Sequence, residues 1–338
     1  MGRLPRSPWT RTAPMELAEP SVATTLLGAA AWVAGEPTSE QGAVLAAFSR
    51  AFGLVDGAVA PTAPDAIIGR VTPNHARRTL QLAIVVGLCR HPFDEAQFVR
   101  VSHLAEALSI GAEELALLDA LVHESAEVAT EDFQRAYDSH LSGLEEERLV
   151  GDDGRLSLEW VTEMRRMDEG SLGRAYIDFH VRHGFRLPGE GTPVPAYYVS
   201  HDMNHVLAGY EPTGPGEIAL GAFKLSMGDT DDNWMAFMAN LLIHEAGLLK
   251  HGEHDQFVPY GGEIYPDAEG QGALHLPGAA ALVAEAFRRG AATSMDFSQA
   301  DHLAMAPRPL VDLRAELGVL ARADGFDGGL GRAWTRVD

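Results

Sequence analysis

Two histidines and two acidic residues in the C-terminal half of the chain have the residue types and the spacing of a metal site. His201, Asp202 and His205 lie within five residues, and Glu217 follows twelve residues after His205. On a helix the two imidazoles, at positions i and i+4, point the same way and lie about 5 to 6 Å apart. One divalent cation can then bridge them.

The residues between His205 and Glu217 predict a helical hairpin. Two prolines and two glycines between residues 210 and 216 should end one helix and turn the chain, so that Glu217 begins the next helix. Facing helices of this kind can build a metal site from both partners. Asp202, about 100° round the helix from His201, can either bind the ion directly or orient a ligand imidazole.

The nitrogen and oxygen donors of this group suit zinc first, with iron, manganese or cobalt as alternatives. The group contains no thiolate, so it lacks the signature of a closed structural zinc site. We therefore expect an open coordination position. The competing interpretation is a histidine pair of the core or the surface that has unrelated acids nearby.

Apolar residues along the chain recur at the three- and four-residue spacing of helices. Leu80, Ile84, Val85 and Leu88 follow this pattern, and Thr72 followed by proline is typical of a helix start. Residues 234–250 are apolar nearly all round, which predicts a buried helix. The predicted fold class is mostly α, with two helical domains. The C-terminal domain is expected to be a helical bundle with the metal site between facing helices.

The domain boundaries are predicted from changes in composition. Residues 1–20 are expected to be a disordered tail rather than a signal peptide, because Glu16 and Glu19 lie where a signal would carry no acids. The apolar run that starts at Val22 should be a first helix. Residues 144–155 are rich in charges and turn formers, so they separate a first helical domain at 21–145 from a second at 155–325.

The overall charge limits the possible partners. The sequence has 48 acidic and 26 basic side chains and a formal charge of -22, which repels nucleic acids and anionic membranes. Cys89 is the only cysteine, so no intrachain disulfide can form, and a reducing cytoplasm is the expected compartment. Any contact with the inner face of the membrane should be peripheral and apolar.

The pattern His-Asp-x-x-His followed by Glu217 resembles the ligand motif of the fourth protein family of coenzyme Q (ubiquinone) biosynthesis. The similarity covers residues 155–320. Within this range, short segments match the family at residues 170–176, 207–210, 216–217, 289–290, 295–297 and 313–318. The first domain weakly resembles the tellurite-resistance TerB-like helical family over residues 83–118. The acidic loop of that family is replaced by Arg90, His91 and Pro92, so no metal role is expected there.

The resemblance implies a metal-dependent enzyme that acts on a prenylated 4-hydroxybenzoate-type aromatic acid. It would remove the C1 carboxyl and install a hydroxyl oxidatively. His201, Asp202, His205 and Glu217 are the implied metal ligands, and Asp202 is also the candidate proton handler. The arginines that the family has before the histidines are absent here, so the ring substrate and the pathway are left open. The implied partners are an apolar-tailed aromatic or isoprenoid molecule, other biosynthetic proteins and a second copy of the chain.

Two other functions are compatible with the sequence. His180 and His183 precede the His-Asp pair in the order used by HD-type metal-dependent hydrolases, in which Glu217 would have no necessary role. A non-catalytic, lipid-binding scaffold of a biosynthetic complex is the third possibility. A further group of polar residues, with a possible supporting role at the metal site, consists of His244, Glu245, His251 and His254.

Overall fold

The computed structural model describes residues 20–54, 59–90, 95–111, 155–185, 187, 196–245 and 272–323. Within these ranges the chain forms helices and no strands, which confirms the prediction of a mostly α fold. The helices are α1 (Pro20–Ala34), α2 (Ser39–Ala51), α3 (Pro73–Leu88), α4 (Glu95–Ala107), α8 (Arg155–Met164), α9 (Leu172–His183), α10 (Ala196–Ala208), α11 (Gly214–Met227), α12 (Asp231–His244), α13 (Ala279–Ala292), α14 (His302–Met305) and α15 (Leu310–Leu317). Short 3-10 turns lie at η1 (Pro64–Ala66), η3 (Ala273–His275) and η4 (Phe297–Gln299).

Several helix ends follow directly from local sequence. Thr72 caps α3 by accepting a hydrogen bond from the backbone N–H of His75, and Pro73 occupies the first helical position, as predicted. The apolar run from Val22 forms most of α1. The predicted helix over residues 234–250 is α12, which ends at His244; residues 246–271 lie outside the described part of the chain. No described helix combines the length and the apolar character needed to cross a bilayer.

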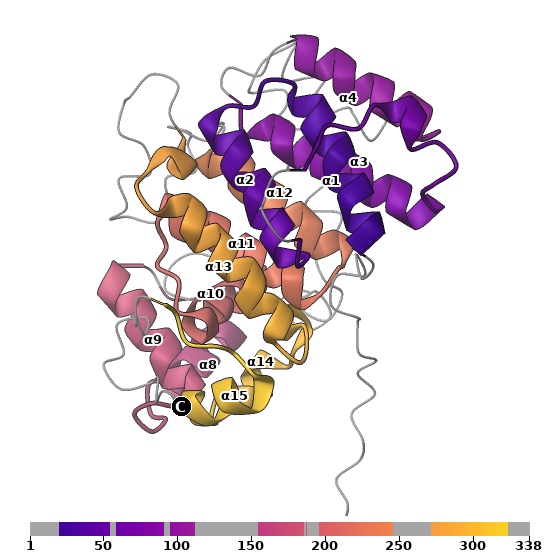
Figure 1. Cartoon of the computed structure of the whole chain (residues 1–338). Coiled ribbons are helices and arrows are strands. Elements are labelled where there is room, and N and C mark those ends of the chain that lie inside the picture. Colours follow the sequence, from indigo (N-terminus) through magenta and orange to yellow (C-terminus); the bar gives the residue numbers. More distant parts are fainter. Residues whose placement is uncertain are drawn as a thin grey trace, which may run out of the picture.

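The helices of the first predicted domain pack directly on those of the second. Helix α13 packs against both α2 and α11, and Figure 1 shows α8, α9 and α15 at the opposite end of the molecule from α1 and α4. Phe48 of α2 contacts the rings of Trp234, Phe237 and Phe287, with centroids 6.5, 6.2 and 4.5 Å away. The buried apolar side chains of both regions therefore form one continuous cluster. The predicted linker at 144–154 lies outside the described residues, so the two-domain division stays a prediction.

The C-terminal end of α10 is held by two arginines from distant parts of the chain. Arg314 is 2% exposed and donates hydrogen bonds to the carbonyl oxygens of Val206 and Leu207. Arg322 donates to the carbonyl oxygen of Gly209 over 2.8 Å. Carbonyls in the last turn of a helix have no partner within the helix, and cations near them are favoured by the helix dipole. These contacts fix the helix that carries His201 and His205.

Candidate metal centre

The predicted hairpin is formed by α10 and α11. Thr213 caps α11 by accepting a hydrogen bond from the N–H of Gly216. The helix therefore begins at Gly214, three residues before the predicted start at Glu217, and Glu217 lies in its first turn. Gly216 allows a close approach, since a Cβ there would lie 1.9 Å from the carbonyl oxygen of Glu211. A carboxylate in the first turn is also favoured by the helix dipole.

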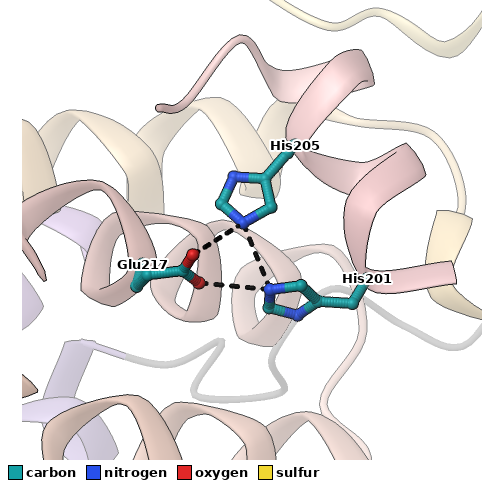
Figure 2. A group of neighbouring side chains, drawn as sticks. All are labelled: His201, His205 and Glu217. Carbon is teal, nitrogen blue, oxygen red and sulfur yellow. Dashed lines mark hydrogen bonds and ion pairs between the residues drawn. The ribbon is translucent and has the colours of Figure 1, made fainter. Parts of the chain in front are cut away.

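The hairpin brings together His201 and His205 from α10 and Glu217 from α11, as Figure 2 shows. The Nε2 atoms of the two histidines are 3.1 Å apart. One carboxylate oxygen of Glu217 lies 3.1 Å from Nε2 of His201, and the other lies 3.1 Å from Nε2 of His205. Side-chain exposure is 1% for His205, 5% for Glu217 and 14% for His201, so the group is closed except on the His201 side.

A backbone contact sets the proton position on His205. Its Nδ1 lies 2.9 Å from the carbonyl oxygen of Tyr210, which can only accept, so Nδ1 carries hydrogen and donates. In the neutral ring, Nε2 is then the unprotonated atom, and it faces Glu217 and His201. Holding the second ring nitrogen in this way is the usual arrangement for a histidine that binds a metal.

The electrostatics of the group also favour a cation at its centre. Burial alone would lower the pKa of His205, but the adjacent Glu217 carboxylate outweighs it and raises that pKa above 6.5. Burial would raise the pKa of Glu217, and the two histidines instead hold it well below 4.5. The interior thus stabilises an ionised carboxylate that needs positive charge beside it.

The donor set fits a divalent ion. Two atoms bound to one ion at about 2.1 Å are roughly 3.0 to 3.4 Å apart in octahedral or tetrahedral geometry. The three separations of 3.1 Å fall in this range. In the described residues, His201, His205 and Glu217 form a group whose potential ligand atoms all lie within 4.8 Å of one another. Two histidines and one carboxylate leave further coordination positions open to a substrate.

Asp202 lies apart from this group. Its carboxylate is 3.0 Å from Nε2 of His180, on the neighbouring helix α9, and the ring of His180 packs 4.5 Å from that of Tyr176. Burial, reinforced by the Asp202 charge, raises the pKa of Tyr176 well above 10. Of the two roles open to Asp202 in the sequence, this position favours holding neighbouring groups over binding the ion. Direct ligation by Asp202 stays a prediction.

Of the additional histidines, His244 adjoins the triad. Its side chain is buried, and burial lowers its pKa to about 4 although the Glu217 charge acts in the other direction. His183 has a pKa lowered to about 4, by burial and then by Arg182, and it pairs with Glu211 at 3.0 Å. Glu245 is buried and accepts a hydrogen bond from the backbone N–H of Leu274. His251 and His254 lie outside the described residues.

Sequence reasoning missed Asn240, which donates a hydrogen bond of 2.6 Å to the backbone carbonyl of Glu217. Asn240 is 8% exposed in a helix whose buried residues are mostly apolar, and a buried amide of this kind usually has a specific polar partner. Met203, Leu207 and Phe237, which lie on the same helices as His205 and His244, are fully buried members of the core.

Comparisons with models of protein families, with curated proteins and with solved structures find no match to this chain. The resemblance to the ubiquinone-biosynthesis family therefore stays a prediction from the sequence motifs, whereas the candidate metal site is supported by its geometry.

Proposed function

We propose that this protein is a metal-dependent enzyme whose ion is held by His201, His205 and Glu217. The observation that carries this proposal is the convergence of two imidazole nitrogens and one carboxylate at 3.1 Å in the protein interior. When bound, a divalent ion supplies a Lewis acid that holds an oxygen of the substrate and stabilises negative charge on it.

For the substrate we propose an aromatic acid of the prenylated 4-hydroxybenzoate type, supported by the motif resemblance. The bond from C1 to the carboxyl breaks and carbon dioxide leaves. An oxygen atom of dioxygen becomes the new hydroxyl, and an external two-electron reductant reduces the other to water. In this proposal Asp202, beside His180, moves a proton at the substrate. Since a prenyl tail favours lipid, we also propose peripheral contact with a membrane.

One observation favours a second candidate, an HD-type hydrolase. The 3.0 Å contact between His180 and Asp202 brings the upstream histidine to the His-Asp pair, which such an enzyme requires. Turnover of phosphoesters that depends on His180 and survives loss of Glu217 would support this reading. The burial of Glu217 against both triad histidines argues for the first proposal.

Elemental analysis of the purified protein tests the metal proposal. Wild type should contain about one divalent ion per chain, and Glu217→Gln should contain less than a tenth of that amount. Glu211→Gln is a matched control, because Glu211 lies in the same hairpin but pairs with Arg182 and His183. Extraction and mass measurement of bound lipid in the same samples address the substrate class.

Two results would contradict the enzyme proposal. Full turnover by metal-free protein would exclude a role for the ion in catalysis. A copurified isoprenoid that is never converted, in protein whose Glu217→Gln variant still assembles with its partners, would indicate the lipid-binding scaffold instead.

A further inference from the structure

His244 is a buried histidine that the triad does not use. It is the last residue of α12 and is 4% exposed. Its Nδ1 atom is buried and makes no hydrogen bond in the part of the chain that the structure describes. A buried polar atom without a partner is unfavourable, and such atoms are found where a ligand or another absent group completes the hydrogen bonding.

The packing of α11 against α12 places His244 beside the metal centre. The two helices run antiparallel: Gly221 lies against Phe237, and Glu217, one turn earlier on α11, accepts a hydrogen bond from Asn240. Asn240 and His244 are at positions i and i+4, so they share one face of α12. His244 is therefore the next residue of this row. It lies at the N-terminal end of α11, the end that carries Glu217 and faces α10.

The electrostatic environment of His244 gives the same location. The charges of Glu217, His201 and His205 all act on its ring. The ring is nevertheless outside the set of donor atoms that lie within 4.8 Å of one another. His244 thus adjoins the centre without belonging to the triad.

We infer that His244 is a positioning residue whose Nδ1–H donates a hydrogen bond to the non-protein ligand of the metal centre. The ligand class is a small donor: water, or an oxygen atom of the substrate or of dioxygen. This inference rests on the metal site proposed above. It assigns His244 a hydrogen-bonding role that neither the His-Asp-x-x-His motif nor Glu217 supplies.

Cobalt-substituted protein titrated with azide provides the test, because azide binds an open position on Co(II) and changes its visible absorption. The variants are His244→Phe, which removes the donor, and His244→Asn, whose amide lies near the place of Nδ1. His275→Asn serves as control, since His275 is half-exposed and pairs with Glu40. Affinity for Co(II) alone should stay within about threefold of wild type in all three variants, because the loss of a protein ligand to the metal would lower this affinity far more.

We expect azide to bind about three- to tenfold more weakly to His244→Phe, the loss of one hydrogen bond, and to recover most of its affinity in His244→Asn. The His275→Asn control should match wild type. Circular dichroism verifies folding, and His244→Leu replaces the phenylalanine variant if that one does not fold.

Three outcomes would overturn the inference while leaving the metal proposal intact. They are unchanged azide affinity in folded His244→Phe, equal weakening in the asparagine variant, and loss of Co(II) itself from a folded His244 variant, which would make His244 a ligand. A wild type that binds no Co(II) would instead overturn the proposed metal site and this inference with it.

Discussion

Nδ1 of His205 donates a hydrogen bond of 2.9 Å to the carbonyl oxygen of Tyr210, five residues further along the chain. The acceptor lies just beyond the end of α10, where the backbone has left the helix. The turn that leads to Glu217 therefore also fixes which nitrogen of His205 faces Glu217. The backbone of this turn thus determines which ring nitrogen of His205 is available to bind a metal.

This arrangement predicts that metal affinity depends on pH. Binding requires His205 to lose a proton, and the neighbouring Glu217 carboxylate, working against burial, raises the pKa of His205 above 6.5. Apparent affinity should be constant above this raised pKa and fall by about tenfold per pH unit below it. Glu217 stays ionised throughout, because its pKa is held well below 4.5.

Competition titrations with a chelator between pH 5.5 and 8.5 measure this dependence. An affinity that stays flat down to pH 5.5 would show that no proton competes with the ion at His205.

Gly216→Ala should damage the turn of the hairpin. The added Cβ would lie 1.9 Å from the carbonyl oxygen of Glu211, and a backbone atom cannot move aside cheaply. We expect a loss of roughly 1 to 3 kcal/mol in the free energy of unfolding, together with weaker metal binding. Chemical denaturation and the Co(II) titration measure the two effects.

Gly42→Ala is the matched control for this variant. A Cβ at Gly42, inside α2, meets nothing within 4 Å. Alanine should stabilise the helix there by about 0.5 to 1 kcal/mol and leave metal binding unchanged. If Gly216→Ala behaved like this control, the turn would not need glycine.

Arg314→Met should destabilise the protein and loosen the metal centre. It leaves the carbonyl oxygens of Val206 and Leu207, at the end of α10, without their buried donor, which costs about 2 to 4 kcal/mol. Arg174→Met removes an ion pair with Asp178 in which both side chains are about 40% exposed, and should change stability by no more than about 0.5 kcal/mol.

Urea denaturation of the two arginine variants compares these effects directly. Equal losses would mean that the buried carbonyls find other donors when Arg314 is absent.

Glu245→Gln should change how stability depends on pH. Burial, reinforced by Glu40 and opposed by the hydrogen bond from Leu274, raises the pKa of Glu245 from 4.5 to about 7. The stabilising contribution of the protonated carboxyl is therefore complete below pH 4.5 and is lost as pH rises to about 7. Over this window wild type should lose about 2 to 3 kcal/mol relative to the glutamine variant.

Denaturation of both proteins at pH 5, 6, 7 and 8 gives the difference. A constant difference across this series would show that Glu245 ionises in the native state as readily as in the unfolded chain.

Asp202→Asn separates the two roles of this residue. Because Asp202 faces His180, 3.0 Å away, we expect the variant to keep its metal within about threefold of wild-type affinity and to lose turnover. A loss of metal as large as that expected for Glu217→Gln would instead establish Asp202 as a ligand, as the motif resemblance implies.

The contrast between Asp202 and the triad shows what the sequence could and could not specify. The spacing of His201 and His205 and the turn formers before Glu217 act locally, so the helix, the hairpin and the meeting of these three residues followed from them. The partner of Asp202 depends on how α9 packs against α10. Helix packing depends on the whole core, which no short motif encodes.

The same reasoning applies to α12. Its apolar character predicted burial, which Trp234 and Phe237 confirm with 0% exposure. The sequence could not say that Asn240 and His244 would face Glu217, because periodicity specifies that a face is buried but not which helix covers it.

The packing of the Phe48 ring against Trp234, Phe237 and Phe287 has a consequence for cooperativity. Phe48, a residue of α2, fills the core between α12, which carries His244, and α13, which packs against α11. Separating the two regions would expose this aromatic cluster to water. Amide hydrogens of α2, α11 and α13 should therefore exchange through one shared opening event, and a bound ion should slow exchange in α2 as well as at its own ligands.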